Sequence, residues 1–144
     1  MTVVDPLRET RADPEAFALM GSERVWTYRE LDRAVESRAD ALRASGRVAG
    51  QVIPLVVDAD AECVIELLAL WRIGATPAPL NAKLTEPERE AARAVLEHAP
   101  AGAQAILWTS GTAGRPRGVV ISFDALGASA HGAAARLELG ADDV

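Results

Sequence analysis

The longest regular pattern of apolar and polar positions in this chain has the spacing of a helix. From Leu31 to Leu42, apolar side chains recur on what would be one face of a helix. Thr27 and Glu30 precede this face with the spacing of a capping box, in which each side chain bonds the other's backbone N–H. Gly46 follows it, where a glycine can end a helix. The pattern predicts an amphipathic helix that covers a core.

Short apolar runs bounded by turn residues predict strands at residues 52–57 and 75–80. The intervening stretch, 60–73, is apolar on nearly every side and predicts a buried helix that Gly74 ends. Pro54 argues against a central position for the first strand, because proline cannot donate to the ladder. Strand, helix and strand in this order predict an α/β fold with a parallel sheet flanked by helices.

The remaining segments extend this picture towards both ends of the chain. Residues 1–16 predict an arm with a short helix near residues 6–11, and residues 17–28 predict a hairpin around Gly21-Ser22-Glu23. Two more helices are expected, each after a capping residue: residues 85–98 after Thr85 and residues 124–137 after Ser122.

One loop has the composition of an anion site. Apolar residues 105–108 and 119–121 predict two strands, and a loop rich in hydroxyls and glycine separates them. Backbone N–H groups in such a loop can converge on an anion, and Arg115 and Arg117 add positive charge. No Asp or Glu occurs between His98 and Asp124. We therefore expect a phosphate-binding loop, although a surface hairpin with ordinary turn residues would share this composition.

The two commonest phosphate motifs do not fit this loop. A Walker loop requires G-x-x-x-x-G-K-[ST] before a helix, whereas Pro116 follows Gly111 at the position of the second glycine and a strand is expected next. No G-x-G-x-x-G fingerprint of a dinucleotide site occurs in the chain.

The loop resembles another signature, that of the adenylate-forming superfamily. Residues 109–118 match T-S-G-T-T-G-x-P-K-G at eight of ten positions when x is Arg115, and Ala113 and Arg117 depart from it. Upstream, Thr27-Tyr-Arg-Glu-Leu31 resembles the family's T-Y-x-E-L, and residues 72–81 resemble R-x-G-A-x-x-x-P-L-N. The resemblance extends from about Phe17 to the end of the chain.

The resemblance implies a fold and a chemistry. The chain would be the N-terminal portion of an AMP-binding domain over residues 1–144, without the later C-terminal domain. Such enzymes activate a carboxylic acid with ATP and Mg²⁺ as an acyl-adenylate, and coenzyme A then displaces AMP. The residues that would hold the ATP phosphates are Thr109, Ser110, Gly111, Thr112, Ala113, Gly114 and Arg117. The family's catalytic lysine has no counterpart here, so no catalytic residue is assigned and we expect this chain alone to be inactive.

Differences from the family's motifs affect the expected affinity for ATP, and the length of one segment suggests a substrate. Arg117 keeps the positive charge of the family's lysine in a chain that has a single lysine, Lys83, among 15 basic residues. Ala113 lacks the hydroxyl of the family's threonine. Phe123 occupies a position where many members have histidine. The short segment between Asn81 and Thr109 resembles the o-succinylbenzoate–CoA ligases of menaquinone biosynthesis.

Composition narrows the remaining possibilities. The 144 residues are 49% hydrophobic, enough for one sizeable core, and the net charge of −6 argues against a nucleic-acid partner. No apolar run has the length of a membrane span, so a cytoplasmic location is expected. Cys63 is expected to be a buried thiol and Glu62 with Glu66 a solvated stripe. His131 has no second ligand at metal spacing, and no metal site is predicted.

Three functions fit the sequence. The first is an acid–thiol ligase of which this chain forms the N-terminal part. The second is a non-catalytic nucleotide-binding remnant, and the third is an α/β interaction module whose loop is only a turn. A reading frame that continues into an aromatic-Gly-x-Thr-Glu segment and a late lysine would favour the ligase.

Overall fold

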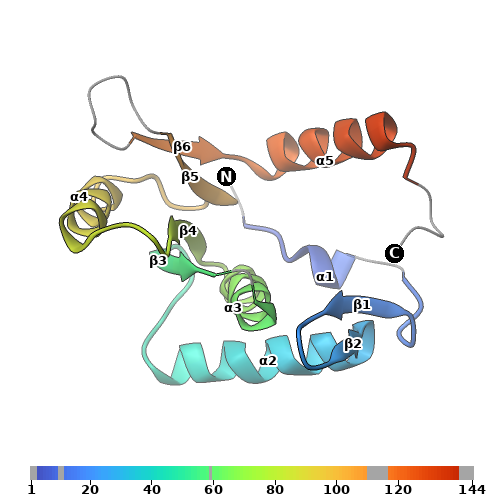
Figure 1. Ribbon diagram of the computed structural model, residues 1–144. Helices are drawn as coiled ribbons and strands as arrows, with labels where there is room; N and C mark the ends of the chain where they lie inside the picture. The colour runs from blue at the N-terminus through green and yellow to red at the C-terminus, as the bar shows by residue number, and fades with distance from the viewer. Residues whose placement is uncertain (1–2, 10–11, 59, 110–116, 140–144) are drawn as a thin grey trace.

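The computed structural model describes residues 3–9, 12–58, 60–109 and 117–139. The described strands form three short pairs, and helices lie beside them (Figure 1). In chain order the elements are α1 (Pro6–Glu9), β1 (Phe17–Met20), β2 (Val25–Thr27), α2 (Tyr28–Ala44), β3 (Val52–Val57), α3 (Ala61–Arg72), β4 (Thr76–Asn81), α4 (Glu86–Leu96), β5 (Ala105–Thr109), β6 (Arg117–Ile121) and α5 (Phe123–Leu137).

The predicted α/β fold is confirmed, but the described strands form separate pairs. β3 and β4 pair in parallel, with α3 as the crossover between them. β1 pairs with β2 and β5 with β6, both antiparallel. The expected parallel sheet is therefore limited to β3 and β4, because strands joined by a short loop can only run antiparallel. Pro54 lies opposite Ala78 in a strand with one partner among the described residues, as a proline requires.

The capping box predicted at the start of α2 is present. Thr27 Oγ1 accepts from Glu30 N at 3.3 Å, and Glu30 Oε2 accepts from Thr27 N at 3.0 Å. The apolar face that follows is buried against α3 and forms the larger core with Trp26. Burying a side chain such as Leu31 stabilises the fold by about 1.5–3 kcal/mol. The spacing read from the sequence thus becomes the α2–α3 interface, made by Leu31, Val35, Ala39, Leu42, Ile65, Ala69 and Leu70.

The turn after α3 explains its sequence. Asp60 caps the start of α3 by accepting from Cys63 N at 2.8 Å, and Gly74 follows its end at φ +76°, in the left-handed region. A Cβ at Gly74 would also lie 3.1 Å from Ala49 Cβ. Both facts favour glycine at this position, because other residues resist a positive φ. The chain then enters β4, whose Ala78 and Leu80 are fully buried.

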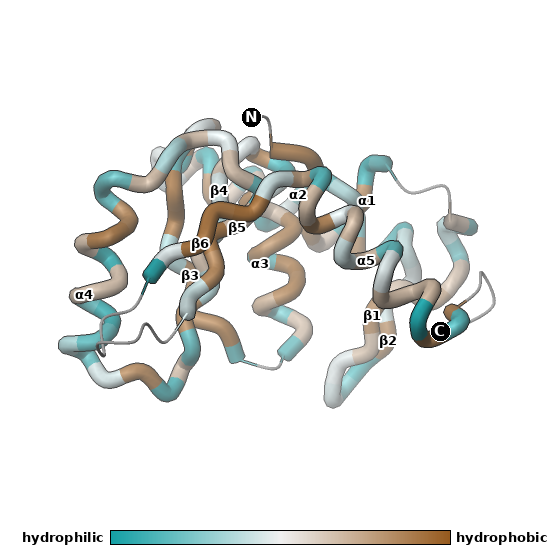
Figure 2. The backbone as a smooth tube through the Cα atoms, turned by 90° about the horizontal axis from the view of Figure 1, so that it is seen from above, coloured by the Kyte–Doolittle hydropathy of each residue, from teal (hydrophilic) through white to brown (hydrophobic). Residues whose placement is uncertain are grey.

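The last two helices, α4 and α5, differ in how much of their surface is buried. α4 has the predicted Thr85–Glu88 capping box and buries Ala92 and Leu96, but it ends at Leu96, short of the expected His98. α5 begins at the predicted cap, where Ser122 Oγ accepts from Ala125 N at 3.1 Å. No residue of α5 is buried within the described chain. The helix continues from the end of β6, on the side of the molecule opposite α2 (Figure 1). Most residues of β5 and β6 are hydrophobic, apart from the hydrophilic start of β6 at Arg117 (Figure 2).

Candidate phosphate-binding hairpin

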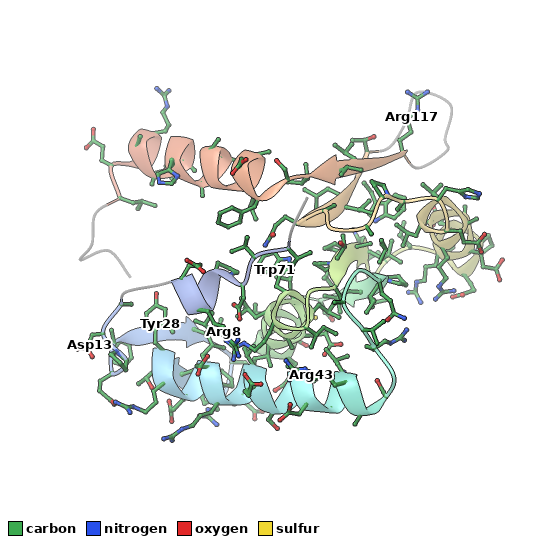
Figure 3. The ribbon with its side chains drawn as sticks, turned by 180° about the vertical axis from the view of Figure 1, so that it is seen from behind. Arg8, Asp13, Tyr28, Arg43, Trp71 and Arg117 are labelled. Carbon is green, nitrogen blue, oxygen red and sulfur yellow. The ribbon has the colours of Figure 1, made fainter. Side chains whose placement is uncertain are left out.

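The residues at the two ends of the resembled phosphate signature belong to the β5–β6 hairpin. The strands pair from Ala105 opposite Ile121 to Thr109 opposite Arg117, so the first and last strand residues face each other across the ladder. Arg117 lies at the end of β6 that is remote from α5 (Figure 3). The two predicted strands are therefore confirmed, and two of the predicted phosphate-binding residues, Thr109 and Arg117, are brought together.

The other predicted residues of this site lie between these two strand ends. They are outside the described residues: Ser110, Gly111, Thr112, Ala113 and Gly114. Their assignment remains a prediction. What the structure gives is the pairing of the two strands, β5 and β6, that precede and follow them in the sequence.

The inner face of the hairpin packs on α4. Ile106 is buried and forms the smaller core with Ala78 and Leu96, and Trp108 packs against this cluster. A Cβ on Gly118 would lie 3.1 Å from Ile106 Cγ2, closer than side chains normally approach. The final glycine of the resembled signature therefore has a packing role here, because it lets β6 lie close to the residues of β5.

The outer end of the hairpin is positively charged. Arg117 is exposed, and the ion pairs of the described residues involve other arginines, such as Arg24, Arg29 and Arg93. The nearest acidic residues along the chain are Glu97 and Asp124. A guanidinium with no carboxylate partner in the described part of the chain remains available for an anion, and its planar donors match phosphate oxygens.

The second upstream motif has a structural role. Arg72 has a side chain only 1% exposed, and its Nε donates to Asp5 Oδ2 at 2.7 Å. Its other donors reach Asp32 and Glu36 of α2. Burial acts to lower the pKa of Arg72, but the hydrogen bonds that it donates to Asp5 and Asp32 outweigh burial and raise the pKa. Arg72 therefore stays charged and joins the N-terminal arm to α2 and α3.

The other residues that the sequence singled out are also structural. Glu66 pairs with Arg38 of α2, so it is a helix-to-helix contact rather than part of a solvated stripe. Cys63 is half-buried, not buried as expected, and its sulfur contacts the backbone of Val56 and Asp58 at the end of β3. Asp58 N donates to its sulfur, which would lower the pKa of the thiol, but burial and Asp60 outweigh this and raise the pKa. A raised thiol pKa does not suit a nucleophile.

His131 is bonded within its own helix. Its Nδ1 lies 2.7 Å from Gly127 O, one turn earlier in α5. Across the described residues there is no group of three or more His, Cys, Asp or Glu side chains that could hold a metal ion. None of the helices described is both long enough and apolar enough to cross a membrane.

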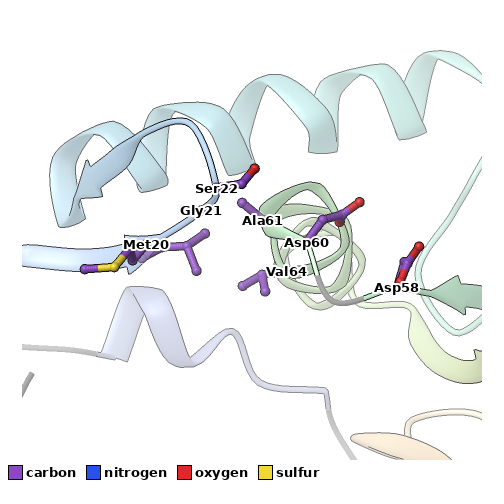
Figure 4. A pocket seen from close by; sticks show the side chains of 8 residues that line it. Met20, Gly21, Ser22, Asp58, Asp60, Ala61 and Val64 are labelled. Carbon is purple, nitrogen blue, oxygen red and sulfur yellow. The ribbon is translucent and has the colours of Figure 1, made fainter.

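Sequence reasoning did not identify a cavity of about 320 Å³ between the β1–β2 turn and the start of α3 (Figure 4). Its lining combines Met20, Val64 and Ala61 with the carboxylates of Asp58 and Asp60. Asp60 is already used as the cap of α3. A cavity with acidic residues and no cationic ones in its lining does not suit a phosphate, so the hairpin remains the candidate site.

Comparison with known proteins gives a consistent result. The family model described as AMP-binding enzyme matches residues 7–103. The 3-hydroxybenzoate–CoA/4-hydroxybenzoate–CoA ligase of Thauera aromatica is 40% identical over 70 residues, covering 49% of this chain and 13% of that protein. Bacitracin synthase 3 of Bacillus licheniformis is 34% identical over 92 residues, covering 62% of this chain and 1% of that protein. The chain thus spans only a small part of these relatives.

The solved structures extend the similarity over nearly the whole chain. O-succinylbenzoate coenzyme A synthetase from Bacillus subtilis, in complex with AMP, superposes with a TM-score of 0.83 at 22% identity, covering 99% of this chain and 48% of that one. The same synthetase in complex with ATP and magnesium ion gives a TM-score of 0.83 at 20% identity, covering 97% and 49%. This chain thus spans about half the length of that structure. The solved structures share the fold of this chain. Because the family model matches more than half of the residues, the chain belongs to the AMP-binding enzyme family.

Proposed function

We propose that this chain provides the phosphate-binding hairpin of a ligase that activates a carboxylic acid with ATP. The product of the first step would be an acyl-adenylate, and coenzyme A would take the acyl group in the second. The observation that carries the proposal is the cross-strand pair of Thr109 and Arg117, which flanks a segment with the adenylate-forming signature.

The hairpin fits the charge of the leaving group. In the first step the carboxylate attacks the α-phosphate, and negative charge accumulates on the departing pyrophosphate. Donors that are fixed before the reaction stabilise such charge without reorganisation. Thr109 and Arg117 would contribute a hydroxyl and a guanidinium, and Ser110, Gly111, Thr112, Ala113 and Gly114 would contribute the backbone and hydroxyl donors between them. Mg²⁺ would accompany the nucleotide and neutralise part of its charge.

As the acyl substrate we propose o-succinylbenzoate, an aromatic carboxylic acid. The short segment between Asn81 and Thr109 supports this choice, and so does the similarity in fold to the synthetase of that name. The similarity to a hydroxybenzoate–CoA ligase also favours an aromatic acid and a coenzyme A acceptor. The whole enzyme would be assayed with both acids, and a preference for hydroxybenzoate would correct the substrate without changing the class of reaction.

We further propose that residues 1–144 are the N-terminal portion of an AMP-binding domain and do not complete a turnover alone. The purified chain should show no pyrophosphate exchange that depends on ATP and a carboxylic acid. Detectable exchange would overturn this part of the proposal.

The test of the hairpin is nucleotide binding by calorimetry. Hydrogen bonds to charged groups contribute about 1.5–3 kcal/mol each, so Ser110→Ala combined with Arg117→Ala should weaken binding of ATP–Mg²⁺ by at least about 100-fold. Arg33→Ala is the matched control, because Arg33 is an exposed arginine of α2. Equal affinity of the wild type and the double variant would leave the loop as a simple turn, as expected of an interaction module.

A further inference from the structure

The start of β5 is fixed by three separate parts of the chain. Trp71 Nε1 of α3 donates to Gln104 O at 2.7 Å, and Thr76 Oγ1 of β4 donates to Ala103 O at 2.7 Å. The Gln104 side chain then binds the N-terminal arm twice: Val4 N donates to its Oε1 at 2.9 Å, and its Nε2 donates to Val4 O at 2.7 Å. Residues 100 positions apart are thus joined by a reciprocal pair of hydrogen bonds.

Gln104 is also part of the hairpin itself. Its backbone N donates to Ile121 O at 2.8 Å, one position before the Ala105–Ile121 pair that opens the β5–β6 ladder. The residue is 1% exposed, and a buried amide must satisfy its donors and acceptors within the protein. Val4 provides one donor and one acceptor in the required geometry. The two bonds therefore fix the arm and the root of the hairpin relative to each other.

The arm is in turn anchored to the larger core. Asp5, next to Val4, accepts from the buried guanidinium of Arg72, and Leu7 packs against the α2–α3 cluster. Through Trp71 and Arg72, the last turn of α3 connects to the residues that surround Gln104. Figure 3 shows Trp71 between α3 and the N-terminal arm. The hairpin is thereby held at its root by the most buried part of the molecule, while its outer end carries the phosphate loop.

We propose that Gln104 is a positioning residue for nucleotide binding, an inference that rests on the function proposed above. The N-terminal arm and α3 hold the root of β5 through Gln104, and the paired strands transmit that orientation to Thr109 and Arg117. Ordering the hairpin before the nucleotide arrives lowers the entropy that binding must lose. Loss of the Gln104 contacts should therefore weaken ATP binding, although Gln104 does not touch the nucleotide.

The matched pair of variants is Gln104→Met and Gln51→Met, because these are the chain's two glutamines. Methionine keeps the approximate length of the side chain and removes its hydrogen bonds. Gln51 accepts one bond from Val48 N in the loop before β3 and has no part in the hairpin. Gln104→Met should raise the dissociation constant for ATP–Mg²⁺ about fivefold. Gln51→Met should change it by less than about twofold, since distant sites act independently.

Two further measurements separate positioning from general stability. Amide hydrogen exchange at Val119 and Ile121 should become faster in Gln104→Met and stay unchanged in Gln51→Met. Deletion of residues 1–4 removes the partner of Gln104 and keeps Asp5 for Arg72, so it should weaken ATP binding to the same extent and add nothing to Gln104→Met. Trp71→Phe, which removes only one of the bonds, should produce a smaller change in the same direction and provides a milder variant if the others unfold.

Each outcome has a definite meaning. If the wild-type chain binds ATP–Mg²⁺ and folded Gln104→Met binds it equally well, the positioning role is wrong and the proposed function stands. If deletion of the arm and Gln104→Met have additive effects, the coupling between them is wrong. If the whole enzyme that contains this chain does not bind ATP–Mg²⁺, the proposed function itself is overturned, which is a result distinct from either of the others.

Discussion

The two ends of this molecule are built differently. Around α2, α3 and the β3–β4 pair, apolar side chains form a continuous core in which Val35, Ala39, Ala69 and Leu70 are fully buried. Around β5, β6 and α5, the inner face of the hairpin is covered, but Leu107, Val119 and Val120 are at least 40% exposed and α5 buries no residue within the described chain. The first region supplies stability, and the second carries the candidate chemistry.

This difference explains which motifs are structural. The segments that resemble T-Y-x-E-L and R-x-G-A-x-x-x-P-L-N lie in the well-packed region. There Thr27 caps α2, and Arg72 joins the N-terminal arm to α2 and α3. The described residues of the phosphate signature, Thr109, Arg117 and Gly118, lie in β5 and β6, in the less buried region. The two upstream motifs thus stabilise the fold, whereas the phosphate signature is the candidate binding site.

The largest expected effect is a difference in unfolding free energy between two leucine-to-alanine variants, one in each region. Leu70→Ala removes a fully buried side chain from the larger core and should lower the free energy of unfolding by about 2–5 kcal/mol. Leu107→Ala changes a side chain that is 45% exposed on the hairpin and should cost less than about 1 kcal/mol. Chemical denaturation of both variants measures the difference. Similar losses for the two would mean that the hairpin belongs to the same cooperative core.

The next effect concerns the buried charge that ties the arm to the core. Arg72→Met leaves the carboxylate of Asp5 without its buried partner and should cost about 3 kcal/mol of unfolding free energy. Arg33→Met, at an exposed position on α2, is the control and should lie within about 0.5 kcal/mol of the wild type. An Arg72 variant as stable as this control would show that the arm is not fixed by the ion pair.

Removing a helix cap should have a different effect in each region: a lower global stability in one and local opening of the helix in the other. Removing a cap costs about 1 kcal/mol of helix stability. In Thr27→Ala this should lower the global unfolding free energy, because α2 is part of the core. In Ser122→Ala it should instead increase hydrogen exchange along α5 with little change in the global value, because that helix has no buried residue among those described. A global loss in both variants would contradict the distinction.

The smallest effect is a pH dependence within the well-packed region. Partial burial acts to raise the pKa of Glu36, but the hydrogen bonds from Arg43 and Arg8 outweigh it, so the pKa lies below its ordinary value of 4.5. A carboxylate with a lowered pKa stabilises the fold above its unfolded-state pKa and loses that contribution as the pH falls through the folded value. Because Glu36 is 41% exposed, the contribution should be below about 1 kcal/mol.

Comparison with Glu36→Gln isolates this contribution. The wild type should be more stable than the variant near neutral pH, and the difference should shrink as the pH falls below 4.5. Urea unfolding at several pH values measures it. A difference that stays constant into the acid range would show that the ion pairs of Glu36 do not depend on its charge.

Local signals in the sequence predicted most of the fold. The capping residues Thr27, Thr85 and Ser122 begin the helices where expected, and the turn residues Gly21-Ser22-Glu23 join the two strands of the predicted β1–β2 hairpin. Such features act over a few residues, so they can be read from the order of residues alone. The end of α4 at Leu96 was not predicted, because residues 97–98 continue a helical composition without a stop signal.

Long-range features could not be read in the same way. Nothing in the sequence indicated that Val4 would pair with Gln104, that Arg72 would join Asp5 to α2, or that Cys63 would stay half-exposed. These depend on how separate elements pack. For the candidate site, the sequence indicated the phosphate loop and its flanking strands, whereas the cross-strand pairing of Thr109 with Arg117 needed the structure.

The central claim is that the outer end of the β5–β6 hairpin binds the phosphates of ATP, and amide chemical shifts test it most directly. Titration of the ¹⁵N-labelled chain with ATP–Mg²⁺ should produce saturable shifts that are largest at Thr109, Arg117 and Gly118 and in the segment between Thr109 and Arg117, with little change along α2 and α3. Saturable shifts centred instead on the cavity beside Met20 and Asp60, with the hairpin amides unchanged, would contradict the account.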